Sequence, residues 1–552
     1  MAGEGAGDDR EGAGGGLSSP GRAFALVFLL HVGLHGFLLT KLDARHVAPH
    51  ARFEVTAVAM SLHERGAFAD PYCLPTGPTA HVPPFPPALL AGIYRLLGPT
   101  LAAGHVTWLV LIAFQGAMWG MLPGLAARLG LSPGAGLLAG VAGALVPRWP
   151  GYVEAPSAIA IGLMLVAFLA RWEGPGPTRA GSLLLGGAIG GALHVSPSLL
   201  PVALGLVAWE ALGAARRPGL LRTALVVAGV ALACVPWTLR NERALGGLFF
   251  LRSNFGLELR MGNHEGAGAN LDLSARAGTE RHPRTNEDEA RKVAELGELA
   301  YMRAAGREAR AWIAAHPGEF LRLTALRVVQ FWLGPVDDFV AALGIGLVTL
   351  LSAAGAWRAF PSLSTDRRAA LLVPFLLFPL VHYVVGFEAR YRQPLDGLAF
   401  LLAASAFLPP KGRGSTSGPG PGSARPGPPA ATSRCRGLRG RGRRGSGPRR
   451  RSPRPCAGRG RRPIPRRGPR RRPRPRGAAS LPRPRRGRRS RGPGARPAPG
   501  RGGRAPLRRR RGGSAGPGSP DPRTRRPPPG RETPGSPRGT RARAAVPRWP
   551  PS

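Results

Sequence analysis

Acidic residues, lysine and cysteine are scarce in this chain of 552 residues. It has 30 Asp and Glu against 77 Lys and Arg, which gives a formal net charge of +47. Such a charge is typical of nucleic-acid-binding proteins. Its four cysteines are far apart and form no CxxC pair, which argues against a disulfide framework and against a cysteine zinc site. They are Cys73, Cys234, Cys435 and Cys456.

The positive charge is concentrated near the C-terminus. Residues 411–552 hold 44 Lys and Arg against two acids, whereas residues 1–410 hold 33 and 28. Because the 411–552 segment is rich in Arg, Pro and Gly and has no apolar period, we expect it to be disordered. GC-rich DNA encodes such residues in almost any frame, so the segment is either a frameshift artefact or a genuine basic tail. We do not expect nucleic acid to be a partner.

The rest of the chain is a series of apolar segments with short connections. In lipid every backbone amide must be satisfied within a helix, so apolar segments of about 17–25 residues indicate membrane spans. We therefore predict an all-α polytopic membrane protein, with a transmembrane domain over residues 21–410. About ten spans are expected, near 23–40, 104–123, 131–147, 153–170, 180–195, 197–214, 220–238, 337–356, 368–386 and 392–408.

The arginine distribution predicts the orientation of these spans. Residues 1–20 carry no basic region before a cleavage site, so the first span is expected to remain as an anchor. Arginines gather in the short loops on one side, which predicts that this side and both termini are cytoplasmic. The two long polar segments, 41–103 and 239–336, then lie on the outer face of the cell (inner) membrane. Within the second, we interpret Phe320–Leu333 as an interfacial amphipathic helix with its Trp and Arg at the lipid headgroups.

Local patterns predict helices in both polar segments. A short helix is expected over Phe53–Arg65, and a second over Ala88–Gly98, with a stiff extended run between them because PTGPTAHVPPFPP is rich in proline. In the later segment, Asn286 is expected to cap a helix and Glu289 to complete a capping box. The spacing of the first segment's histidines is not a ligand pattern, so no metal is expected. These histidines are His46, His50 and His81.

Three stretches in these polar regions resemble the membrane glycosyltransferases of the GT-C superfamily. They are GAFADPY with PTAHVPPFPPALLA, then PWTLRNERALGGLFFLRSNFGLELRMGN, and finally EARYRQP before the last span. By pattern the chain is most similar to the bacterial family 39 or RgtA/B/C/D-like group, related to protein O-mannosyltransferases and the lipid A aminoarabinose transferase. The resemblance covers roughly residues 20–408. It implies transfer of a sugar, without a cofactor, from a polyprenyl-phosphate donor to a glycan, lipid or protein acceptor on the outer face.

The resemblance also implies a general base in the first outer loop, often supplied by an Asp–Glu pair before a short helix. Here Phe53 replaces the first acid, so Glu54 is the single candidate for that position. Chemically, a carboxylate can take the proton of an attacking hydroxyl, and guanidinium groups can hold the leaving phosphate. The candidates are Glu54 and Asp70 for catalysis, Arg240, Arg252, Arg390, Tyr391 and Arg392 for the donor phosphate, and His81, Asn254 and Asn263 for substrate.

Several candidates also have an ordinary structural interpretation. Glu54 could be an acid favoured by the dipole of a helix start, and Asp70 could be a turn residue. Arg240 could anchor a span end, and Asn254 and Asn263 could serve in turns. The rival function is a transporter or flippase of lipid-linked sugars, for which charges at the membrane midplane would be expected. The sequence shows no pair of charges at mid-span, which favours the enzyme.

Overall fold

The structure is a computed structural model that describes residues 19–49, 53–213 and 219–409. The described residues are mostly helical and contain no strand, only two isolated β-bridges, which confirms the all-α class. The predicted tail, 411–552, lies outside the described residues, as do residues 1–18. The expectation that the tail is disordered therefore stays a prediction.

Six helical stretches among the described residues are long and apolar enough to cross a membrane. They are α1 (Pro20–Leu39), α5 and α6 together (Leu101–Leu129), α8 (Glu154–Glu173), α11 (Leu220–Leu245), α17 with the short helix η2 (Phe339–Ser362), and α18 with α19 (Thr365–Val385). Each coincides with a span expected from the sequence. The protein is thus a helical, membrane-embedded chain by length and composition.

Helices also occur at the other four predicted spans, but they are short. These are α7 (Pro133–Leu145), α9 (Arg179–Val195), α10 (Leu200–Leu212) and α20 (Gln393–Ser405). At 1.5 Å per residue, a helix of 13 residues covers about 20 Å, less than the roughly 30 Å of a hydrocarbon core. The expected number of ten spans therefore stays a prediction.

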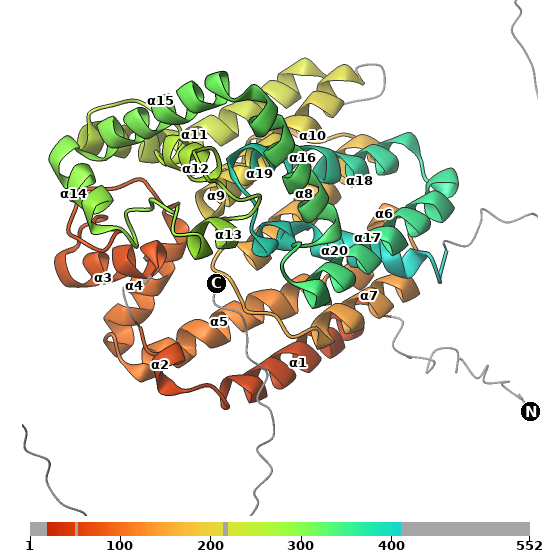
Figure 1. The fold of residues 1–552 in the computed structure, drawn as a ribbon. Helices are drawn as coiled ribbons and strands as arrows, with labels where there is room; N and C mark the ends of the chain where they lie inside the picture. Colours follow the sequence, from red (N-terminus) through yellow and green to blue (C-terminus); the bar gives the residue numbers. More distant parts are fainter. Residues whose placement is uncertain (1–18, 50–52, 214–218, 410–552) are drawn as a thin grey trace, which may run out of the picture. The chain divides into compact units, whose positions relative to one another are not determined.

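Small residues allow the apolar helices to approach closely, as the sequence predicts. The helices α9 and α11 pack along each other, and a Cβ atom on Gly186 would lie 2.0 Å from the Val226 carbonyl oxygen. A Cβ atom on Gly229 would likewise lie 2.2 Å from the carbonyl oxygen of Leu183. Around them, α1 packs on α5, and α20 packs on α7, α8 and α17 (Figure 1).

One buried ion pair among these helices was missed in the sequence. Arg171 on α8 and Glu210 on α10 form two hydrogen bonds, of 2.8 and 2.6 Å, and both side chains are buried. Each residue lies two positions before the end of its helix, so the pair sits near helix ends. It therefore does not contradict the expectation that no charges pair at mid-span.

The first polar segment forms α2 (Ala44–Val47), α3 (Glu54–Arg65) and α4 (Phe85–Leu97). The predicted helix over Phe53–Arg65 is confirmed, with Phe53 as its N-cap. The second helix begins at Phe85, so the prediction of an extended chain through the last prolines is wrong. Its prolines occupy the first turn, where a missing N–H group leaves no hydrogen bond unmade.

The second polar segment forms a group of helices beyond the end of α11. They are α12 (Phe255–Gly262), α13 (Leu271–Arg276), α14 (Glu287–Leu296), α15 (Glu298–Ala315) and α16 (Pro317–Leu333). Asn286 caps α14 as predicted, because its side chain accepts the Glu289 N–H at 3.1 Å. The predicted capping box is wrong, since the Glu289 carboxylate instead pairs with Arg260 and Lys292.

The helix α16 differs from the predicted interfacial helix in the position of Arg327. Its side chain is fully buried and donates to the carbonyl oxygens of Gly262 and Val384 and, at 3.3 Å, to the side-chain oxygen of Asn263. The expectation that this arginine lies at the lipid headgroups is therefore wrong. The guanidinium group instead joins α16 to the end of α12 and to the end of α19 (Leu380–Val385). It therefore fixes the outer helices to the bundle.

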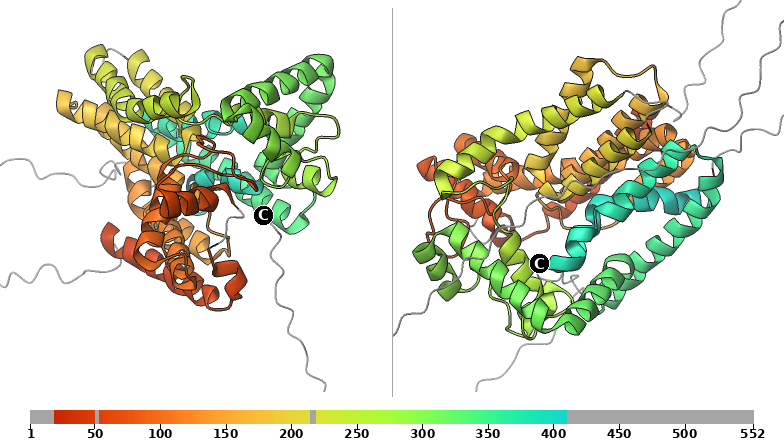
Figure 2. Two further views of the ribbon diagram at one scale, coloured as in Figure 1. Left: turned by 90° about the vertical axis from the view of Figure 1, so that its left-hand side faces the viewer. Right: turned by 90° about the horizontal axis from the view of Figure 1, so that it is seen from above.

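The two polar segments contact each other. In Figures 1 and 2 the helices α3 and α4 lie near α14. The closest links run through Glu298 at the start of α15, which accepts the Ala80 N–H at 2.8 Å and the Ser253 hydroxyl at 2.5 Å. The Thr79 hydroxyl donates to the same carboxylate. Burial raises the pKa of Glu298, while these three donors oppose the rise.

Candidate functional site

The carboxylate of Glu54 lies where the two polar segments meet. Its Oε1 atom is 3.4 Å from Nε of Arg284 and 3.7 Å from Nε2 of His282, and both partners belong to the turn before α14. Glu54 is the first residue of α3, where the helix dipole favours a negative charge. Its side chain is 20% exposed, so it is partly buried and still open to a substrate.

The hydrogen bond at Nδ1 of His282 indicates which ring nitrogen carries the proton. Nδ1 accepts the backbone N–H of Arg284 at 3.1 Å, so the neutral ring carries its own proton on Nε2. That N–H faces the Glu54 carboxylate. His282 and Arg284 therefore lie where they can orient the Glu54 carboxylate.

His81 packs beside His282 and is not exposed to solvent. It is buried, and its ring meets those of His282 and Tyr72 edge to face, with centroids 5.6 and 5.1 Å apart. Burial, and to a smaller extent the nearby Arg252 and Arg284 guanidinium groups, hold the pKa of His81 well below its usual value. His81 is thus a neutral wall of the site, and the predicted substrate contact would have to come from its edge.

Glu54, His81 and His282 offer ligand atoms that all lie within 4.8 Å of one another. Two imidazoles and a carboxylate are a set that Zn²⁺ or Fe²⁺ can take. With its proton on Nε2, however, His282 presents a hydrogen-bond donor to Glu54 and no lone pair for a cation. The Arg284 guanidinium, 3.4 Å from the same carboxylate, also competes with a metal ion. The arrangement fits a carboxylate held among basic side chains better than a metal centre.

Arg252 is an expected phosphate ligand that remains partly exposed in the structure. Its Nε donates to the His81 carbonyl oxygen at 2.6 Å, and its nearest acid, Glu258, is 3.9 Å away. The side chain is 29% exposed, and it interacts electrostatically with Glu54. With Arg284, which is 30% exposed, it places two guanidinium groups around the candidate base.

Arg240 has a structural role instead. Its guanidinium donates to the carbonyl oxygens of Thr79 and Phe68 at 2.6 and 2.9 Å, and it lies over the rings of Phe68 and Trp237. These contacts tie the end of α11 to the first polar segment. The guanidinium therefore has less capacity for a donor phosphate than the sequence suggests.

The stretch from Arg390 to Arg392 forms the short helix η3 (Ala389–Arg392), and its charges are largely compensated. Arg390 pairs with Glu388, and Tyr391 stacks on His382 with ring centroids 4.6 Å apart. Arg392 is buried, 3.5 Å from Asp396, which also pairs with Arg148. The Arg390 side chain is 49% exposed and is the one member of this stretch that remains open.

Asp70 is a turn residue in the structure. Its Oδ1 accepts the N–H groups of Thr76 and Gly77, both at 2.7 Å, and its other oxygen pairs with Arg65. Asp70 itself has a left-handed backbone with φ 57°. These contacts match its alternative interpretation and leave Glu54 as the stronger candidate for the base.

The two candidate asparagines also form structural hydrogen bonds. Asn254 donates to Glu258 at 2.6 Å. Asn263 is fully buried, donates to the carbonyl oxygens of Leu259 and Val384 at 2.8 Å, and accepts from Arg327. Both amides thus have protein partners, which leaves Asn263 without capacity for a sugar hydroxyl.

Sequence reasoning missed His282 and Arg284, which lie in the stretch RHPRTNEDEA. The available signal was the concentration of two arginines and a histidine directly before a capped helix, in a segment assigned to the same face as Glu54. A comparison with known proteins finds no matching family model, no similar curated protein and no similar solved structure. The interpretation of the site therefore rests on the residues and their geometry.

Proposed function

We propose that the chain is an integral-membrane glycosyltransferase that moves a sugar from a polyprenyl-phosphate donor to an acceptor on the outer face of the cell membrane. The observation that carries this proposal is the partly exposed Glu54 carboxylate beside His282 and Arg284. It combines a proton acceptor with cations at the junction of two polar segments, next to helices apolar enough to lie in lipid.

In the proposed reaction an acceptor hydroxyl attacks the anomeric carbon of the donor sugar. A new carbon–oxygen bond forms, and the bond between the anomeric carbon and the phosphate oxygen breaks. The polyprenyl phosphate leaves with the electron pair of that bond. The hydroxyl proton passes to the Glu54 carboxylate, which acts as the general base.

The neighbouring residues have separate tasks in this scheme. The His282 Nε2–H orients Glu54, while Arg252 and Arg284 stabilise the charge that develops on the departing phosphate. Arg390 is the third guanidinium open to a lipid phosphate. Arg240, Arg392, Asp70 and Asn263 keep the segments that carry these groups in place, since their polar atoms contact other parts of the chain.

Transfer from a set of radiolabelled polyprenyl-phosphate sugars, in membranes that contain the protein, tests this proposal. The expected result is label released from the lipid and recovered on an acceptor. Label that crosses the membrane while still on the lipid would instead support the rival, a transporter or flippase of lipid-linked sugars. Glu54→Gln should lose transfer, and its matched control is Glu64→Gln. Glu64 is an exposed acid on the same helix as Glu54, so its substitution should not affect transfer.

A further inference from the structure

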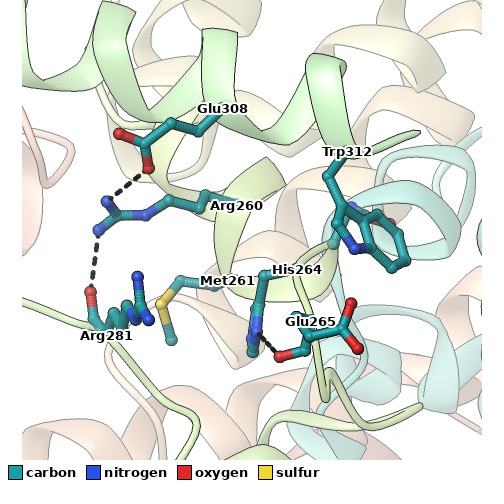
Figure 3. Close-up of a pocket in the computed structure, with 8 residues that line it drawn as sticks. Arg260, Met261, His264, Glu265, Arg281, Glu308 and Trp312 are labelled. Atoms are coloured by element: carbon teal, nitrogen blue, oxygen red, sulfur yellow. Dashed lines mark hydrogen bonds and ion pairs between the residues drawn. The ribbon is translucent and has the colours of Figure 1, made fainter. Parts of the chain in front are cut away.

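A pocket of about 200 Å³ lies among the outer helices, between α12 with its following turn and α15 (Figure 3). One side is formed by the end of α12 and the residues after it, and the opposite side by Glu308 and Trp312 of α15. Its lining residues are Arg260, Met261, Asn263, His264, Glu265, Arg281, Glu308 and Trp312. Nothing in the proposed reaction so far uses this pocket.

Part of the lining has a purely structural role. Arg260 donates to Glu289 at 2.7 Å, to the Tyr301 hydroxyl at 2.6 Å and to the Arg281 carbonyl oxygen at 3.0 Å. A further contact of 3.3 Å runs to Glu308. These bonds hold α12, α14 and α15 together and give the pocket rigid walls.

Two other lining groups have polar atoms without a partner. The indole N–H of Trp312 and Nε2 of His264 are both buried and form no hydrogen bond with any residue that the structure describes. Nδ1 of His264 contacts the Glu265 carbonyl oxygen at 2.8 Å, so it carries the ring proton and leaves Nε2 as an acceptor. An unpaired buried polar group is unfavourable, so a donor and an acceptor together in one pocket indicate a ligand.

The rim adds charged groups that remain accessible. The Glu308 side chain is 60% exposed, and Arg281 is exposed. The pocket thus offers an aromatic ring, an N–H donor, an imidazole acceptor and a carboxylate within a volume too small for a large ligand. An apolar chain would leave these polar groups unpaired, whereas a ring with several hydroxyls both donates and accepts hydrogen bonds.

We propose that this pocket binds one sugar ring of the acceptor, and therefore that the acceptor is a glycan. The assignment to the acceptor rests on the proposed glycosyltransferase function. The Trp312 N–H donates to a sugar hydroxyl, and His264 and Glu308 accept from others. The amphipathic indole suits a ligand that has both C–H and O–H groups.

The pocket adjoins the candidate base through the chain itself. Arg281 lines the pocket, and the next residue, His282, faces Glu54 at 3.7 Å. Consecutive Cα atoms are about 3.8 Å apart, so the two sites share one short stretch of backbone. In this proposal a glycan held in the pocket extends toward Glu54, so that a remote sugar ring positions the attacking hydroxyl.

Saturation-transfer NMR with the full chain in a detergent without sugar headgroups tests the pocket directly. The probes are the methyl glycosides of glucose, mannose, galactose, arabinose and glucuronic acid. We expect at least one glycoside to bind the wild type. Trp312→Ala should weaken its binding by about tenfold or more, and Trp312→Phe, which keeps the ring, by about three- to tenfold, the range of one hydrogen bond.

The matched control is Trp357→Phe, the same substitution at a tryptophan that is 84% exposed on α17, and it should leave binding unchanged. No binding of any glycoside by the wild type, or unchanged binding by Trp312→Ala, would overturn the proposal. Because binding needs no donor, Glu54→Gln should retain it. If the protein binds a glycoside but transfers no sugar, the result would contradict the proposed glycosyltransferase function. It would not contradict sugar binding by the pocket.

Discussion

The Nε2 atom of His282 lies 3.7 Å from the carboxylate of Glu54, although the two residues belong to separate polar segments of the chain. Because Nδ1 of His282 accepts the Arg284 N–H, the proton on Nε2 points to the carboxylate. This relationship gives the Glu54 carboxylate a partner that can hold its orientation.

Substitution of His282 should reduce transfer without removing donor binding. His282→Ala leaves Glu54 unoriented, and we expect kcat to fall by about 10- to 100-fold, the effect typical of a group that positions an acid or base. His282→Gln can place an amide N–H near the original Nε2 position, so it should recover a large part of the activity. Equal losses in the two variants, measured in the same membranes, would contradict the role of the His282 N–H in positioning Glu54.

Arg252 and Arg284 should act on the donor phosphate. A hydrogen bond to a charged group contributes about 1.5–3 kcal/mol, so Arg252→Ala or Arg284→Ala should lower kcat/KM for the lipid donor by roughly 10- to 100-fold. Steady-state transfer against donor concentration measures this. The control is Arg291→Ala, an exposed arginine whose surface pairs with Glu287 and Asp288 should matter little. A loss as large in the control would rule out a specific phosphate contact.

The outer helices should lose stability in acid because of Glu289. Burial alone would raise its pKa, but hydrogen bonds from Lys292, Tyr301 and Arg260 lower it from 4.5 to about 2. The stabilisation from this lowered pKa is complete above pH 4.5 and is lost as the pH falls toward 2. A shift of this size corresponds to roughly 3 kcal/mol. Hydrogen exchange of α14 and α15 should accelerate over that range.

Glu289→Gln provides the comparison for this pH dependence. It leaves the buried Arg260 without its closest carboxylate, so exchange at neutral pH should already be faster than in the wild type. The further acceleration below pH 4.5 should be smaller, because the group that titrates is gone. An identical pH profile in the two proteins would show that another acid controls the stability of these helices.

Chelation should leave transfer unchanged. The Nε2 proton of His282 and the guanidinium of Arg284 both face the carboxylate that a metal ion would need. We therefore expect full activity after dialysis against EDTA. Activity that is lost on dialysis and restored by Zn²⁺ or Mn²⁺ would show that Glu54, His81 and His282 hold a cation, with His282 in its other tautomer.

The fold follows from sequence patterns wherever they are local. The apolar runs predicted the positions of the long helices. Asn286 marked the start of α14, because an N-cap hydrogen bond joins residues only three positions apart in the sequence. Arg327 shows where such patterns fail. An arginine on an amphipathic helix can lie at the lipid surface or be buried on backbone carbonyls, and only the packing of α12, α16 and α19 decides between them.

The site was predictable in part. The resemblance to GT-C enzymes pointed to Glu54, as an acid directly before a short helix, and to Arg252, in a stretch that follows a span. The sequence did not pair His282 and Arg284 with Glu54, because the turn that carries them has no periodic pattern. The position of this turn relative to Glu54 depends on contacts between distant residues, such as Glu298 with Ala80. Asp70 and Asn263 were overestimated, because sequence does not show which polar side chains already have protein partners.

The measurement that tests the central claim most directly compares the wild type with Glu54→Gln in transfer from a radiolabelled polyprenyl-phosphate sugar, with lipid-donor binding measured in parallel. Gln keeps the shape of the side chain and removes its ability to take a proton. The account predicts donor binding unchanged and transfer reduced by about 100-fold or more. Full transfer by Glu54→Gln would contradict it and show that another group is the base.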